Sequence, residues 1–185
     1  KNQILFYRGS VSDKLKRWKN ATKEFDIDFF VTADGDDIFC DPILIDLAFN
    51  QFQKSGNTVD FIKSDKIVCG AFTYGIKTTA LEKVCDIKNT NDTEMMWVYF
   101  TETGIFDVQE LSNVNKSFFR NDVRMTLDYK EDLDFFSTII NHFDGRDYDL
   151  KDILAFIDKN PEVKKINFHL QEKWTQNQKN KTKLL

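Results

Sequence analysis

Three carboxylates lie within four residues of the sequence, at Asp34, Asp36 and Asp37. Negative charges this close repel one another, so they need a cation, a basic partner or open water. Two interpretations are open: a solvated acidic turn on the surface, or a magnesium site that serves a nucleotide. A metal at this place is expected to be a hard, oxygen-bound ion, because the chain has only two His and three widely spaced Cys.

The residues around this acidic loop place it at the end of a strand. Residues 29–33 are mostly aromatic or β-branched, which predicts a buried strand. Asp41 and Pro42, which follow the loop, are typical of a helix N-cap and a first helical turn. In an open parallel sheet, ligands bind outside the carboxyl ends of the strands. The loop is therefore where a ligand is expected.

Asp128 is a second carboxylate at a predicted strand end, here after residues 123–127. Parallel strands end at one edge of a sheet, so Asp36 and Asp128 can share a magnesium ion that bridges to phosphate oxygens. The alternative role of Asp128 is to cap a helix, because Glu131 lies three residues further on, as in a capping box. Both interpretations stay open from the residues alone.

Basic residues near the two aspartates are candidates for anion binding. Arg8 and Ser10 precede a predicted helix, whose first backbone amides can hold an anion, and Arg17 lies on that helix. Ser10 can instead be an N-cap, and Arg17 a solvated helix residue. Arg120 and Arg124 precede the second aspartate and can pair with a carboxylate or phosphate. A surface salt bridge is the alternative for these two.

Predicted strands and helices alternate along most of the chain, which favours an α/β fold with a mainly parallel sheet in a single domain over residues 1–185. The predicted strands are residues 4–7, 29–33, 60–63, 106–111 and 123–127, and residues 68–76 mix glycines with strand formers. Thr78 or Thr79 is expected to cap a helix. From about residue 166 we expect a polar helix or tail.

Composition narrows the class of protein. The 185 residues are 41% hydrophobic, which is enough for one sizeable core. The net charge of −4 argues against a surface for nucleic acid. No apolar run approaches the roughly 20 residues of a membrane span. The few, widely spaced cysteines suit a reducing compartment, so a cytoplasmic location is expected.

Motifs in a fixed order resemble those of a known family. They are Arg8-Gly9-Ser10 with Asp13, Leu15 and Arg17; Gly35-Asp36 with Asp41-Pro42; Gly70 to Ile76 with Ala80-Leu81; Arg124-Met125-Thr126-Leu127-Asp128-Tyr129 with Glu131-Asp132-Leu133; and Asn160-Pro161 with Ile166-Asn167. In these motifs the chain resembles the cytidylyltransferases that include the synthetases of CMP-activated sugar acids and spore-coat polysaccharide proteins. The resemblance covers nearly the whole chain.

The resemblance implies a fold, an activity and roles for particular residues. The fold would be the three-layer α/β/α domain of nucleotide-diphospho-sugar transferases, usually a homodimer. The activity would be transfer of CMP from CTP to an ulosonic or nonulosonic acid with release of pyrophosphate, for surface polysaccharide synthesis. The implied site comprises Asp36 and Asp128 as catalytic ligands of Mg²⁺, Arg8, Ser10, Arg17 and Gly35 for the nucleotide, and Tyr74, Gly75, Arg120 and Arg124 for the sugar acid.

Departures from the family pattern keep other functions open. The family begins with a strand and a loop rich in Arg, Ser, Gly and Lys that grips the triphosphate and cytosine. We expect this chain to start after that loop and to be N-terminally incomplete. Asp37-Ile38 and Glu94-Met95 also replace the family's x-Pro and Glu-His. The alternatives are a catalytically silent nucleotidyltransferase-like module of a larger polysaccharide enzyme, and a metal-dependent glycosyltransferase.

Overall fold

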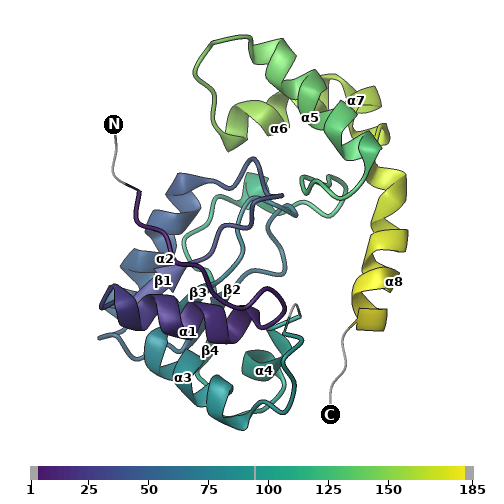
Figure 1. The fold of residues 1–185 in the computed structure, drawn as a ribbon. Helices are drawn as coiled ribbons and strands as arrows, with labels where there is room; N and C mark the ends of the chain where they lie inside the picture. The colour runs from purple at the N-terminus through teal and green to yellow at the C-terminus, as the bar shows by residue number, and fades with distance from the viewer. Residues whose placement is uncertain (1–3, 94, 182–185) are drawn as a thin grey trace.

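The computed structural model describes residues 4–93 and 95–181. Helices and short strands are interspersed up to residue 110, and every described regular element beyond that residue is a helix (Figure 1). The elements are α1 (Lys14–Glu24), β1 (Phe29–Val31), α2 (Pro42–Lys54), β2 (Phe61–Lys63), β3 (Gly75–Lys77), α3 (Thr78–Ile87), α4 (Val98–Thr101), β4 (Val108–Glu110), η1 (Lys116–Phe118), α5 (Lys130–Phe143), α6 (Leu150–Lys159), α7 (Pro161–Lys165), η2 (Phe168–Leu170) and α8 (Gln171–Lys181).

The four described strands form one mixed sheet in the order β1-β3-β2-β4. Strand β3 is antiparallel to both β1 and β2, whereas β4 is parallel to β2. The prediction of a mainly parallel sheet is therefore wrong for these strands. The connection from β2 to β3, residues 64–74, contains no helix. Parallel neighbours need a longer crossover, usually a helix, so this connection reverses the chain instead.

Two predicted strands do not form. Residues 4–7 form no regular secondary structure, residues 4–6 are exposed, with Ile4 83% exposed, and the segment pairs with no strand in the part of the chain that is described. Residues 123–127 make only an isolated parallel bridge, between Arg124 and Cys69. Their backbone forms hydrogen bonds with loops instead: the Met125 amide donates to the Cys69 carbonyl at 3.1 Å. Strand formers at these positions thus join loops rather than extend the sheet.

Two helix starts also differ from the prediction. Asp13, rather than Ser10, caps α1 by accepting a hydrogen bond from the Lys16 amide. Lys77 is the N-cap residue of α3, and its ammonium cannot accept a hydrogen bond, so the helix has no side-chain cap. Thr78 is the first helical residue, and its hydroxyl donates to the carbonyl of Ile27. The cap and proline expected at the start of α2 are both present, since Asp41 accepts from the amides of residues 43 and 44.

Helices cover both faces of the sheet. Phe61 and Ile62 are neighbours in β2, and they belong to different core clusters because successive strand residues point to opposite faces. The cluster around Phe61 packs side chains of α1, α3 and α4, and the cluster around Ile62 packs those of α2 and α5 to α7. Among the described helices, none combines the length and apolar character needed to cross a membrane.

Candidate active site

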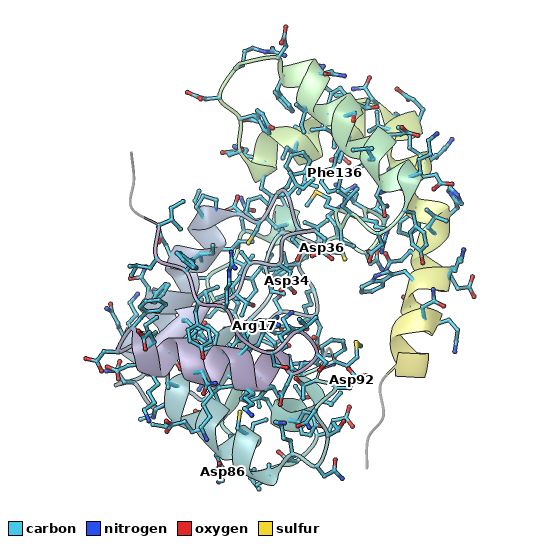
Figure 2. All side chains as sticks on the ribbon, viewed as in Figure 1. Arg17, Asp34, Asp36, Asp86, Asp92 and Phe136 are labelled. Carbon is cyan, nitrogen blue, oxygen red and sulfur yellow. The ribbon has the colours of Figure 1, made fainter. Side chains whose placement is uncertain are left out.

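A cavity of about 1310 Å³ lies where the acidic loop meets segments from both halves of the chain. Its lining residues fall within segments 11–17, 34–37, 63–74, 90–92, 95–101 and 126–128, together with Gln171 and Trp174. Asp34 and Asp36 lie near the middle of the molecule, between the helices around the sheet and the group of α5 to α7 (Figure 2). The cavity therefore brings together segments that are far apart in the sequence.

The acidic loop gathers three carboxylates at one place. One oxygen from each of Asp34, Asp36 and Asp37 lies within 4.8 Å of the others. Two turns fold the loop in this way: the Asp37 amide donates to the Asp34 carbonyl, and the Cys40 amide to the Asp37 carbonyl, each at 3.0 Å. A Cβ added at Gly35 would meet no atom within 4 Å, so the space beside the cluster is open. Several convergent carboxylate oxygens fit a hard cation such as Mg²⁺.

Asp37 is the member of this cluster whose carboxyl has a clearly raised pKa. Its pKa rises from 3.8 to about 7, first because burial disfavours the charged form and then because Asp36 and Asp34 repel it. A hydrogen bond with Thr126 opposes this rise in part. A cation bound among the three carboxylates would remove the repulsion and restore the ionised form.

Asp34 has a basic partner that sequence reasoning missed. The Lys14 ammonium lies 2.8 and 3.0 Å from its two carboxylate oxygens. Lys14 begins α1, and its position in the cavity depends on how that helix packs against the acidic loop. Helical periodicity alone gives no signal for this pair, because the two residues are 20 positions apart.

Asp128 reaches the same cavity through a backbone contact between two loops. The Leu127 amide donates to the Asp36 carbonyl at 3.0 Å, which draws the second aspartate beside the first loop. Asp128 lines the cavity but lies outside the group of three carboxylates. It does not cap α5, because Asp132 accepts from the Asp128 and Tyr129 amides, each at 2.9 Å. The capping interpretation thus applies to Asp132 instead.

Arg124 lies beneath the cavity wall and is fully buried. Its guanidinium donates to Asp128 at 2.5 Å and to Asp132 at 3.1 Å, and Asn167 also donates to Asp132 at 2.9 Å. The structure therefore places Arg124 where it orients Asp128, rather than on the cavity surface. Arg120 also lies off the cavity wall, in ion pairs with Asp122 at 2.7 Å and Asp158 at 2.9 Å.

The predicted nucleotide-binding residues divide between the cavity and its surroundings. Arg17 lines the cavity, and its guanidinium donates to the carbonyls of Ser10 and Val11. Ser10 is not on the wall; its hydroxyl accepts from the Asp13 amide at 3.0 Å. Arg8 is exposed and also off the wall. The loop before α1 is thus held by Arg17, and only part of it reaches the site.

Of the predicted sugar-binding residues Tyr74 and Gly75, only Tyr74 lines the cavity. Tyr74 lines the cavity and stacks on Phe61 and Trp97, with ring centroids 5.1 and 6.2 Å apart. Gly75 is buried within β3, where a Cβ would lie 2.7 Å from the Phe29 ring. Close packing of β1 against β3 therefore explains this glycine, whereas Tyr74 is available to a ligand.

A buried ion pair fixes two walls of the cavity to each other. Asp13 is 2% exposed and accepts from Lys88 at 2.7 Å and from Thr93 at 3.2 Å. Burial alone would raise the pKa of Asp13, but the hydrogen bond from Lys88 and others hold it below its ordinary value. The pair ties the start of α1 to residues 90–93. Sequence reasoning missed it because the partners are 75 positions apart.

Comparisons with known proteins agree with this fold. No family model matches the chain. The uncharacterized protein MJ1063 of Methanocaldococcus jannaschii is 30% identical over 175 residues, covering 90% of this chain and 68% of the archaeal protein. A solved cytidylyltransferase of Leptospira borgpetersenii superposes with a TM-score of 0.75 at 23% identity, covering 84% of this chain and 66% of that one. The fold of a cytidylyltransferase is thereby confirmed over most of this chain, which spans about two thirds of the length of each of the two relatives.

Proposed function

Because the chain belongs to the same family as the archaeal protein MJ1063 and has the fold of a solved cytidylyltransferase, we propose that it is a metal-dependent nucleotidyltransferase. The proposed reaction transfers CMP from CTP to a hydroxyl group of an ulosonic or nonulosonic acid. The hydroxyl oxygen attacks the α-phosphorus and loses its proton to solvent, the bond to the bridging oxygen breaks, and pyrophosphate leaves. The observation that supports this most is the cavity in which the acidic loop and Asp128 meet.

The chain's own residues have distinct parts in this proposal. Asp36 and Asp128 would hold Mg²⁺, with Asp34 and Asp37 beside them, since all four carboxylates line one cavity. Bound Mg²⁺ would polarise the α-phosphate and offset charge on the leaving pyrophosphate. Lys14 fixes the position of Asp34 through its ion pair. The site thereby presents oxygen ligands of set geometry before substrate arrives.

The acceptor and the biological setting rest on the family resemblance. Arg120 and Arg124 are engaged with carboxylates of the chain itself, as are Lys14 and Lys63 on the cavity wall. Recognition of a sugar-acid carboxylate would therefore fall to Arg17, which lines the wall and donates to the carbonyls of Ser10 and Val11. A three-layer arrangement, a homodimer, a cytoplasmic location and a role in surface polysaccharide synthesis are parts of the same proposal. Light scattering of the purified protein would test the dimer.

Release of pyrophosphate tests the proposed function. The full-length protein, CTP and Mg²⁺ would be combined with a panel of ulosonic and nonulosonic acids. We expect release that depends on one of these acids and on the metal, and a loss of at least about 100-fold in D36N. The matched control is D86N, an exposed carboxylate on α3 that lies far from Asp36 (Figure 2), and it should retain turnover. No release with any acid would refute the proposal.

A further inference from the structure

Trp174 is an aromatic residue on the most polar of the described helices. Helix α8 reads Gln-Glu-Lys-Trp-Thr-Gln-Asn-Gln-Lys-Asn-Lys, so Trp174 is its one aromatic side chain. It lines the cavity together with Gln171 from the preceding turn. Trp18 and Trp97 pack against the core cluster around Phe61, whereas Trp174 belongs to neither core cluster of the described residues. Core packing therefore does not explain the indole.

Arg124 fixes Trp174 beside the acidic site. The guanidinium carbon lies 5.1 Å from the centroid of the Trp174 ring, within the range of a cation–π contact. The same guanidinium donates to Gln171 at 3.4 Å and to Asp128 at 2.5 Å. The buried arginine thus links the indole to the carboxylate that the proposed reaction uses. An aromatic wall that is fixed in advance loses little conformational entropy when a ligand binds.

We propose that Trp174 is a ligand-binding residue whose indole packs against the flat face of a substrate ring in the cavity. This inference rests on the proposed function. The ring is either the base of the nucleotide or the pyranose of the acceptor, since both present a face to an aromatic side chain. The Trp174 indole contacts the Arg124 guanidinium and also lines the cavity. Helix α8 is then a wall of the binding site and not only a C-terminal extension.

The matched variants are W174A, W174F and E172A, each in the full-length protein. Stacking of a base on an aromatic side chain contributes about 1–3 kcal/mol, so W174A should bind its ligand about 5- to 150-fold more weakly. W174F keeps a ring and should stay within about threefold of the unchanged protein. Glu172 is exposed on the same helix and does not line the cavity, so E172A should bind normally. Calorimetry with Mg²⁺ and either CTP, CMP or the sugar acids measures each affinity.

The pattern of losses identifies the ring and tests the inference. Weaker binding of CTP and CMP assigns Trp174 to the base, and weaker binding of the sugar acid alone assigns it to the acceptor. Equal affinities in W174A and the unchanged protein would overturn the inference and leave the proposed function standing. No binding of any of these ligands by the unchanged protein would overturn both. A ligand-induced change in Trp fluorescence that W18F keeps and W174F loses would support the contact even if W174A fails to fold.

Discussion

Replacing Asp37 by Asn should stabilise the protein at neutral and alkaline pH when no divalent metal is present. Burial and two neighbouring carboxylates raise the pKa of Asp37 from 3.8 to about 7. Between these pH values the folded protein keeps a proton that the unfolded chain has released. The unfolded state then binds fewer protons, so stability falls as pH rises through this window. An Asn side chain does not ionise, and D37N escapes the loss.

The size of the effect follows from the pKa. One pKa unit corresponds to about 1.36 kcal/mol, so a rise from 3.8 to about 7 destabilises the ionised protein by about 4 kcal/mol. Asp37 retains some exposure to solvent, which screens the repulsion and reduces the effect to about 2 kcal/mol. The free energy of unfolding of D37N minus that of the unchanged protein should therefore be small near about pH 4 and about 2 kcal/mol near about pH 8.

Urea denaturation in the presence of a chelator at these two pH values measures the difference. D86N, which removes an exposed carboxylate on α3, controls for the loss of one negative charge. Millimolar Mg²⁺ should raise the stability of the unchanged protein near pH 8, and should raise that of D37N less, because a ligand stabilises the state that binds it. A difference between D37N and the unchanged protein that stays constant from pH 4 to pH 8 would refute the reasoning.

Substitutions at Gly70, Gly35 and Arg124 test the backbone and the buried arginine that hold the site. In G70A the new Cβ would lie 1.8 Å from the Met125 carbonyl oxygen, at a residue whose φ is +88°. We expect the free energy of unfolding, measured by urea denaturation, to fall by at least about 2 kcal/mol. G35A is the matched control: a Cβ there meets open space, so the free energy of unfolding should fall by less than about 1 kcal/mol. R124M leaves Asp132 buried without its cation, so it should destabilise the protein by about 3–5 kcal/mol, and a loss under about 1 kcal/mol would contradict the role assigned to this ion pair.

Local signals in the sequence predicted the acidic loop well. The run of strand formers before it gave β1, and Asp41 and Pro42 gave the start of α2, because caps and proline act within a few residues of the chain. The loop therefore lies between a strand and a helix, as expected. Its three carboxylates converge because two short turns fold it, which again is a local event.

Interactions between distant segments could not be predicted in this way. The direction of β3 depends on how residues 64–74 turn, and no residue type in them specifies an antiparallel partner. The buried position of Arg124 depends on its ion pair with Asp132. The carboxylate of Asp132 also accepts hydrogen bonds from backbone amides at the start of α5. An arginine in a loop before a helix is ordinarily exposed. Only the folded chain shows that Arg124 is buried together with Asp132.

The pairing of Asp36 with Asp128 was expected from parallel strand ends, but the structure brings them together differently. Residues 123–127 form no strand, and the amide of Leu127 donates to the carbonyl of Asp36 instead. The charges are then distributed unequally. Lys14 pairs with Asp34 and Arg124 with Asp128, whereas no basic side chain pairs with Asp36 or Asp37 within the residues that the structure describes.

This distribution ranks the carboxylates as ligands. A carboxylate that already has a cation gains less from a second one than a carboxylate that faces only like charge. In the proposed metal site, Asp36 and Asp37 would therefore contribute most of the drive for cation binding. Asp128, held by Arg124, would add negative potential beside them: the pKa of Asp37 is raised first by burial, then by Asp36 and Asp34, and to a smaller extent by Asp128. On this ground Asp37, which sequence reasoning left undecided, becomes as strong a candidate ligand as Asp128.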